Sequence, residues 1–358
     1  MDYQSRRMRL KAAMKAAGIS HMLITAPANR YYLTGFELHD TQCAESSGCL
    51  LVPASGKDVL FTDARFQQEA QACLPDGQVV LYRRRFVDLP GLVRDHGATD
   101  LWVEEEYLSA REHRALAEHI RLHPAPPLVE GLRQRKSPEE LERLRASCAL
   151  NHAVFARLSE LLRPGITEAQ LAWELESLFR TSGAQELSFP TIVGFGPNSA
   201  KAHAIPGSVA LTPETPVLVD MGCRLRDYCS DQTRSLWFGH TPTAEFTQAL
   251  GLAQEAQARA IEAIAPGVPC AHVDRIARDF LARHGMADHF THSLGHGIGL
   301  ETHEAPRLSA HETAILEPGM VITVEPGLYF PWGGVRWEHM VVVTEAGREV
   351  LGAEEVDS

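Results

Sequence analysis

The sequence has no apolar stretch that approaches the roughly 18 residues of a membrane span. Its start, Met1 to Arg7, leads into an amphipathic segment and lacks the apolar core of a signal peptide. Basic residues are also in deficit, because 34 Lys and Arg stand against 46 Asp and Glu, for a formal net charge of −12. We therefore expect neither a membrane nor a nucleic acid as a partner.

Cysteine is scarce and follows no metal-binding spacing. The seven cysteines form an odd number without a C-x-x-C pair, which predicts reduced thiols in a cytoplasmic protein. The zinc motif His-Glu-x-x-His is missing, since His303-Glu304 is followed by Arg307. A phosphate-binding glycine loop is missing too, because Gly194-Phe195-Gly196 lacks the third glycine.

The length of 358 residues and the hydrophobic content of 44% suit two globular domains. Up to about residue 125, strand-like and helix-like segments alternate, which is typical of a small α/β domain. One of these segments, residues 109–122, reads as a helix. The proline-rich break at 123–127 then marks a boundary, so we expect domains at 1–127 and 128–358.

The second domain contains an internal repeat. Pro164-Gly165 recurs as Pro266-Gly267, 102 residues later, and the strand-like Val217-Leu-Val-Asp220 recurs as Ile322-Thr-Val-Glu325, 105 residues later. Several apolar positions between them match as well. We infer a duplicated α+β domain with two halves related by a pseudo-two-fold axis.

A stretch rich in histidine and glycine lies within the second repeat. His292, His296 and His303 stand among glycines at 295, 297 and 299. Although His292 and His296 have helical spacing, three glycines in five residues disfavour a helix. The stretch therefore predicts extended backbone that other chains can approach closely.

Acidic residues occupy matching positions in the two repeats. Asp220 and Glu325 each end an apolar strand, and Asp231 and Glu338 follow on what we expect to be hairpin-connected neighbouring strands. Each acid alone suits a surface ion pair, but four carboxylates and His296 placed by a repeat favour a shared metal site. Such an oxygen-rich ligand set can neutralise two divalent cations.

With these residues in view, the chain resembles the pita-bread metallopeptidases, which include aminopeptidase P, prolidase, methionine aminopeptidase and creatinase. The matching blocks run from Ser188 to Glu338 in the family's order and cover nearly the whole second domain. The first domain resembles the creatinase-like N-terminal domain, most clearly at Asn29 to Phe36. The resemblance implies an α/β N-terminal domain followed by an α+β pita-bread catalytic domain.

The resemblance also implies an exopeptidase that cleaves the bond before proline in X-Pro dipeptides or longer X-Pro peptides. It assigns Asp220 to one metal, Asp231 and Glu338 to both, and His296 and Glu325 to the second. Glu325 is also the implied proton shuttle. His203 and His303 are implied to hold the substrate carbonyl, and His292 to line the proline pocket, while Arg336 pairs with a ligand. Manganese is the favoured metal, with cobalt or zinc as alternatives, and family habit suggests a homodimer.

Two features depart from the family pattern and leave alternatives open. His339 stands where the family usually has aspartate, and Lys201-Ala202 precedes His203 where leucine-proline is common. A creatinase-like hydrolase, another enzyme with a non-peptide or non-proline substrate, and a non-enzymatic binding member remain alternatives, although such relatives tend to lose ligands. Arg307 lies where prolidases carry a carboxylate-binding arginine, and it inclines us slightly towards a dipeptidase.

Overall fold

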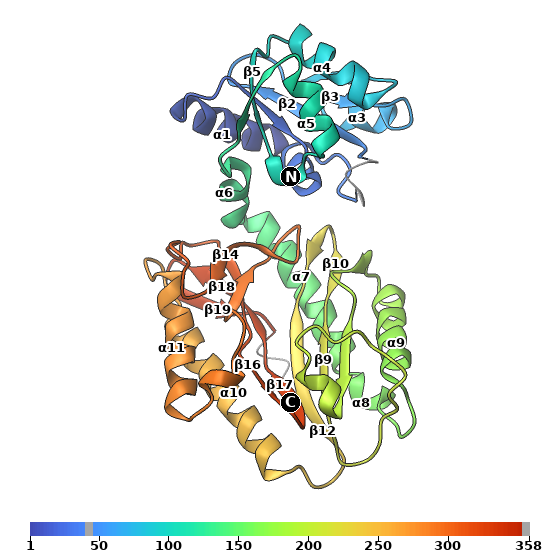
Figure 1. Cartoon of the computed structure of the whole chain (residues 1–358), viewed down its shortest axis with the longest axis vertical. Helices are drawn as coiled ribbons and strands as arrows, with labels where there is room; N and C mark the ends of the chain where they lie inside the picture. Colours follow the sequence, from blue (N-terminus) through green and yellow to red (C-terminus); the bar gives the residue numbers. More distant parts are fainter. Residues whose placement is uncertain (40–45, 353–358) are drawn as a thin grey trace. The chain divides into compact units, whose positions relative to one another are not determined.

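The computed structural model describes residues 1–39 and 46–352, and the chain forms two compact units, Met1–Arg133 and Gln134–Ser358 (Figure 1). The boundary expected after residue 127 falls just before helix α6 (Leu128–Gln134), which runs to the junction. Six cysteines in the described part are free thiols, and Cys43 lies outside it. Among the described residues, no helix is both long enough and apolar enough to cross a bilayer.

The first unit is built on a six-stranded mixed sheet in the order β4-β3-β2-β1-β5-β6. Its strands are β1 (His21–Ile24), β2 (Gly48–Pro53), β3 (Val59–Thr62), β4 (Gln78–Leu81), β5 (Asp100–Val103) and β6 (Arg121–Pro124). Its helices, besides α6, are α1 (Tyr3–Ala16), α2 (Pro27–Thr34), α3 (Gln67–Cys73), α4 (Arg85–Asp95) and α5 (Ala110–Ala117). The alternation of strands and helices confirms the expected α/β domain.

The prediction of a helix over residues 109–122 is wrong after residue 117. Helix α5 ends at Ala117, and β6 pairs in parallel with β5 so that Leu122 lies opposite Leu101. The ring of His123 stacks on Trp102 with centroids 4.5 Å apart. Pairing with the free edge of β5 therefore overrides the helical pattern of this segment.

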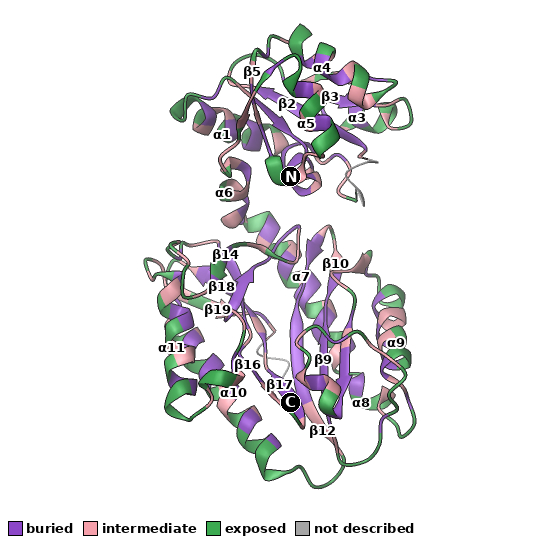
Figure 2. Ribbon diagram, in the orientation of Figure 1, coloured by how far each residue is buried: buried purple, intermediate pink, exposed green. Residues whose placement is uncertain are grey.

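The second unit carries its helices as an outer layer over inner strands, and the buried residues concentrate on those strands (Figure 2). The helices are α7 (Pro138–Phe155), α8 (Leu158–Leu161), α9 (Glu168–Thr181), α10 (Ala244–Glu262) and α11 (Cys270–Arg283). Helices α7 and α9 begin at complete capping boxes on Ser137 and Thr167, where side chain and backbone satisfy each other's first-turn groups.

The strands of this unit form one set of sheets in each half. The first half has β7 (Glu186–Leu187), β8 (Ile192–Phe195), β9 (Thr215–Met221), β10 (Cys223–Leu225), β11 (Tyr228–Cys229) and β12 (Gln232–Phe238). The second half has β13 (Gly295–Gly297), β14 (Glu304–Leu308), β15 (Val321–Val324), β16 (Gly327–Phe330), β17 (Gly333–Arg336), β18 (His339–Thr344) and β19 (Gly347–Val350). Their orders are β12-β9-β8 with β11-β10-β7, and β14-β13-β15-β18-β19 with β16-β17.

The internal repeat is confirmed at the level of single backbone hydrogen bonds. Gly165 and Gly267 both have φ of 85°, and their N–H groups donate to the carbonyls of Leu211 and Leu316 at 2.8 Å. Helices α9 and α11, which follow these turns, each contain 14 residues. Separate apolar cores then form, one around Leu175 and Val219 and the other around Leu281 and Ile322. The fold is therefore a pseudo-two-fold pita-bread domain.

Candidate metal centre

Two carboxylates of the first half come from neighbouring antiparallel strands. Asp220 lies near the end of β9, and Asp231 directly precedes β12. In the ladder between these strands, Thr233 of β12 lies opposite Asp220. The ladder between the two strands continues in the same register into β10 and β11, where Arg224 lies opposite Cys229, so the expected hairpin connection is confirmed. The hairpin leaves both acids at one end of the ladder.

The second half repeats this arrangement. Glu325 directly follows β15 and Glu338 directly precedes β18, while Val324 and His339 are paired between these antiparallel strands. Here too the ladder continues in the same register into a hairpin, β16–β17, where Gly327 lies opposite Arg336. The two halves thus present one acidic pair each from equivalent positions.

The pairs meet along the seam between β12 and the start of β18. The backbone N–H of Glu338 donates to the carbonyl of Thr233 at 3.2 Å. The Thr233 hydroxyl donates to Glu338 Oε2 at 2.8 Å. Both Asp231 and Glu338 are buried, at 5% and 1% exposure. Residues separated by more than a hundred positions in the chain therefore share one buried site.

His296 enters the same site from β13, which is a strand as predicted and not a helix. Strand β13 is confined between β14 and β15, and a Cβ atom on Gly295 would collide with the carbonyl of Thr323. The His296 Nδ1 lies 3.0 Å from the carbonyl of Gly297, which fixes that nitrogen as the donor. Its Nε2 faces the acids, 3.6 Å from Asp231 Oδ2 and 3.3 Å from Glu325 Oε1.

The electrostatics of the site are dominated by crowding of negative charge. Burial raises the pKa of Asp231 and of Glu338 well above the usual range, and the charges of neighbouring carboxylates add to the rise. Burial would also raise the pKa of Glu325, but the hydrogen bond and charge of His296 outweigh it and bring that pKa to about 2. Conversely, Glu325 outweighs the burial of His296 and raises the pKa of its imidazole.

The donor set fits divalent cations. Asp231, His296 and Glu338 each offer a ligand atom, and these atoms lie within 4.8 Å of one another. In addition, Asp220 Oδ1 and Glu338 Oε1 are buried without a hydrogen-bond partner in the described part of the chain. Buried, unsatisfied carboxylate oxygens are costly unless they are neutralised, and hard cations prefer such ligands.

Arg336 supports the site from β17. Its guanidinium donates to Asp220 Oδ2 at 2.6 Å, to the Tyr329 hydroxyl at 2.8 Å and to the carbonyl of Ala202 at 3.2 Å. The Tyr329 hydroxyl lies 3.0 Å from Nε2 of His292. Arg336 therefore links a predicted ligand to the predicted proline-pocket histidine and to the loop that carries His203.

The remaining predicted residues lie around this cluster. The ring of His303 stands edge-on to that of His296 with centroids 4.3 Å apart, and His303 lies near enough to Arg307 and His203 to interact with them electrostatically. Desolvation, followed by the charge of His296, lowers the pKa of His303 to about 4. Arg307 lies in β14 directly opposite His296 in the ladder with β13, so both project from the same face of the sheet.

Some residues that shape the site are absent from our sequence predictions. Thr323 accepts from the backbone N–H of His296 at 3.0 Å and donates to Glu325 Oε1 at 3.2 Å. Thr233 and Tyr329 hold Glu338 and Arg336 as described above. The sequence could have indicated Thr323 and Thr233, because each lies two residues from a predicted ligand, Glu325 or Asp231. Alternate side chains of extended backbone share a face.

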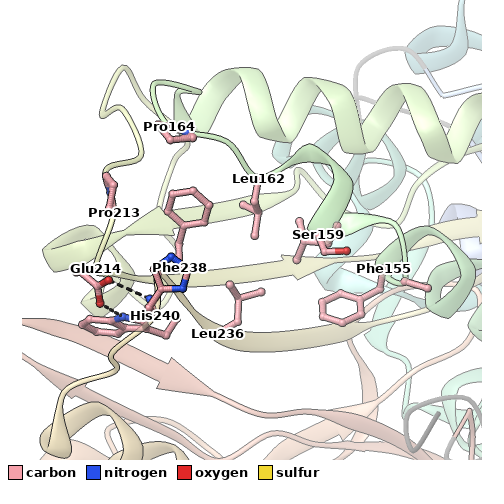
Figure 3. Close-up of a pocket in the computed structure, with 13 residues that line it drawn as sticks. Phe155, Ser159, Leu162, Pro164, Pro213, Glu214, Leu236, Phe238 and His240 are labelled. Atoms are coloured by element: carbon pink, nitrogen blue, oxygen red, sulfur yellow. Dashed lines mark hydrogen bonds between the residues drawn. The ribbon is translucent and has the colours of Figure 1, made fainter.

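A separate pocket of about 650 Å³ lies beside β12 and contains none of the predicted site residues (Figure 3). Its lining is mostly apolar and includes Phe155, Leu162 and Phe238. At its rim, the Glu214 carboxylate accepts from Trp237 Nε1 at 2.9 Å and from the backbone N–H of His240 at 2.9 Å. Glu214 therefore fastens the end of β12.

The comparisons with known proteins agree with this architecture. The metallopeptidase family M24 model matches residues 142–345, and the creatinase/prolidase N-terminal domain model matches residues 6–135. An uncharacterised peptidase of Staphylococcus haemolyticus is 35% identical over 332 residues, which cover 92% of this chain and 93% of that protein.

Solved structures extend the likeness to both units. The Xaa-Pro dipeptidase from Bacillus anthracis has a TM-score of 0.91 at 32% identity, with 98% of each chain covered. The X-Pro aminopeptidase from Thermotoga maritima has a TM-score of 0.83 at 30% identity, with 95% of this chain and 97% of that chain covered. Since the family model spans more than half of the sequence and the likeness extends over its whole length, the chain belongs to metallopeptidase family M24 and carries the creatinase/prolidase N-terminal domain.

Proposed function

We propose that this chain is a metal-dependent exopeptidase that hydrolyses the peptide bond before proline in short peptides. The observation that carries the proposal is the convergence of Asp231, His296 and Glu338 in one buried cluster, flanked by Asp220 and Glu325. The retained ligand set argues against relatives that have lost metal ligands, such as a metal-free creatinase-like hydrolase or a binding-only member. A metal-loaded member that cleaves a non-peptide bond is the alternative that the cleavage assay below tests. The names of the two similar structures, an Xaa-Pro dipeptidase and an X-Pro aminopeptidase, support the choice of substrate class.

Five residues hold two divalent cations in this proposal. Asp220 would hold one, His296 and Glu325 would hold the other, and Asp231 and Glu338 would be shared between them. When bound, such cations supply Lewis acidity that activates water and polarises a carbonyl. Four carboxylates against two double positive charges leave the buried cluster close to neutral, which relieves the crowding that raises the pKa values of Asp231 and Glu338.

The other residues handle the peptide and its protons. The Glu325 carboxylate is ionised at neutral pH and accepts a proton from the attacking water, then delivers it to the leaving amine. His303 is neutral at that pH and donates an N–H to the developing oxyanion, with His203 beside it. His292, oriented by Tyr329, lines the pocket for the proline ring.

The test is a cleavage assay on the full chain with a panel of X-Pro peptides and added manganese, cobalt or zinc. Asp231→Ala and Glu338→Ala should abolish turnover, because each removes a carboxylate shared by two cations. The exposed Asp279 on α11 provides the control Asp279→Ala, which should retain full activity. Full activity in either cluster variant, or cleavage of Ala-Ala as fast as Ala-Pro, would refute the proposal.

Substrate length depends on Arg307 in this proposal. The proposal is supported by the pairing of Arg307 with His296 in the ladder and by the effect of the Arg307 charge on His303. A guanidinium can donate two parallel hydrogen bonds to a carboxylate, which is what the free C-terminus of an X-Pro dipeptide offers. We therefore favour the dipeptidase over the aminopeptidase.

Arg307→Ala should raise KM for Ala-Pro much more than KM for Ala-Pro-Ala. Arg307→Lys, which keeps the charge but loses the two-pronged donor, should lie between the wild type and alanine. The comparison of kcat/KM for both peptides in the three proteins decides the matter. A wild type that prefers Ala-Pro-Ala, together with no effect of Arg307→Ala, would identify an aminopeptidase in which Arg307 has no recognition role.

A further inference from the structure

Gln257 connects helix α10 to both acidic positions of the second half. It is buried, at 4% exposure, and its side-chain Nε2 donates to the carbonyls of Val324 at 2.7 Å and Trp337 at 3.1 Å. These two residues directly precede Glu325 and Glu338. One amide therefore uses both of its N–H groups on the backbone that leads into two proposed cation ligands.

His339 supplies the hydrogen-bond partner of the Gln257 side-chain oxygen. The His339 Nδ1 lies 3.1 Å from Oε1 of Gln257, and the amide oxygen can only accept, so Nδ1 carries the hydrogen. The opposite nitrogen, Nε2, lies 2.8 Å from Nη2 of Arg234, which can only donate. The two partners together fix one neutral tautomer and one ring orientation.

Arg234, on β12, contacts residues 337–339. Its guanidinium lies 4.4 Å from the centroid of the Trp337 ring, donates to the carbonyl of Glu338 and contacts His339. It is buried, at 1% exposure, and no carboxylate forms an ion pair with it in the described part of the chain. Three consecutive residues centred on Glu338 are thus held by one rigid, planar cation.

We propose that Gln257 and His339, together with Arg234, are positioning residues that set the cation affinity of the site by fixing the backbone of Glu325 and Glu338. None of the three touches the carboxylate cluster itself, so they act only through the residues they hold. The inference rests on the proposed cation site. It accounts for the histidine at position 339, because an aspartate there could not donate to the Gln257 oxygen.

The test measures Mn²⁺ binding to the chelator-treated full chain by titration calorimetry, with thermal unfolding in chelator and steady-state kinetics on Ala-Pro alongside. Gln257→Met and His339→Leu keep side-chain volume but remove the hydrogen bonds. His339→Gln keeps an acceptor for Arg234 and a donor for Gln257, whereas the shorter amide of His339→Asn cannot span both partners. Gln254→Met, half-buried one turn earlier on α10, is the matched control.

We expect Gln257→Met and His339→Leu to weaken Mn²⁺ binding by about 10–100-fold, as is typical when partners of metal ligands are lost. We expect kcat to fall with little change in KM. His339→Gln and Gln254→Met should bind Mn²⁺ like the wild type. If an apolar variant fails to fold, the pair His339→Gln and His339→Asn gives the same comparison, with only the asparagine weakened.

Wild-type Mn²⁺ affinity in the folded apolar variants, or equal loss in His339→Gln and His339→Asn, would overturn the inference even if the unfolding temperature fell. Failure of the wild type to bind Mn²⁺ would instead refute the proposed cation site. Binding by the wild type without cleavage of X-Pro peptides would refute only the peptidase proposal.

Discussion

Replacing Asp231 by asparagine should change the stability of the cation-free and the cation-loaded protein in opposite directions. The substitution preserves shape and removes an ionisable carboxyl from a buried cluster in which burial, and then the charges of Glu338 and Asp220, raise the pKa of Asp231. A raised carboxyl pKa means that the folded state loses stability as pH rises from about 4, the unfolded value, towards the folded value. At pH 7 the variant avoids that loss, so the chelated variant should be more stable than the chelated wild type.

The magnitudes follow from linkage. The substitution stabilises the chelated protein by about 1.4 kcal/mol for each unit by which the pKa of Asp231 is raised above its unfolded value, counted only up to the assay pH of 7. Manganese at 100 times its Kd adds ~2.7 kcal/mol to the wild type, which corresponds to about 5–10 °C in Tm for a unit of this size. If the substitution weakens binding about 100-fold, the same manganese concentration adds only ~0.4 kcal/mol.

The assay is calorimetric unfolding of the full chain at pH 7, in chelator and in manganese. The order of Tm values for the second unit should reverse between the two buffers. Asp279→Asn, which neutralises an exposed carboxylate in the same unit, should leave both values within about 1 °C of the wild type. An Asp231→Asn variant that is less stable by the same amount in both buffers would show that the Asp231 carboxyl is neither destabilised in the cluster nor needed for cation binding.

Three further predictions concern single residues. His303→Ala should keep the manganese-induced rise in Tm while its kcat falls by on the order of 100–1,000-fold. His296→Ala should lose both the rise in Tm and the turnover. Equal loss of metal in the two variants would contradict their different roles. Burial raises the pKa of Glu104 to about 7, so its contribution to stability is full below about pH 4 and is lost as pH rises through 7. The free energy of unfolding, measured with urea, should therefore fall by ~3 kcal/mol more between pH 5 and pH 8 in the wild type than in Glu104→Gln. Parallel pH profiles of the two proteins would exclude this effect. Gly295→Ala should cost ~1–3 kcal/mol through the collision in the ladder, while Gly251→Ala, in open space on α10, should be neutral or stabilising.

The cluster could be predicted from the sequence because a duplicated domain repeats the same residue types at a nearly constant spacing. Asp220 and Glu325 end equivalent apolar strands, and the structure brings both next to His296 and Arg336. The glycines around His296 likewise indicated extended backbone, since only a residue without Cβ fits where Gly295 meets Thr323. These features depend on local chemistry or on periodic spacing, which one sequence can reveal.

The rest depends on contacts between distant segments. The short strands β10, β11, β16 and β17, which extend the two expected hairpins, have no strong period because each contains only two to four residues. Gln257 looks like any other polar position of an amphipathic helix until α10 is packed against β15 and Trp337. Strand β6 was hidden for the same reason, since its partner β5 decides its conformation.

The seam between the halves also has a kinetic meaning. Asp220 and its counter-charge Arg336 are 116 residues apart, and Thr233 and Glu338 are 105 residues apart. Contacts at such separations close long loops, so they form late in folding, after each half has built its own core. A cation that needs ligands from both halves finds no complete site on a newly made or partly folded chain. Binding at the proposed site should therefore slow the separation of the two halves during unfolding, and contribute little to the rate at which they first associate.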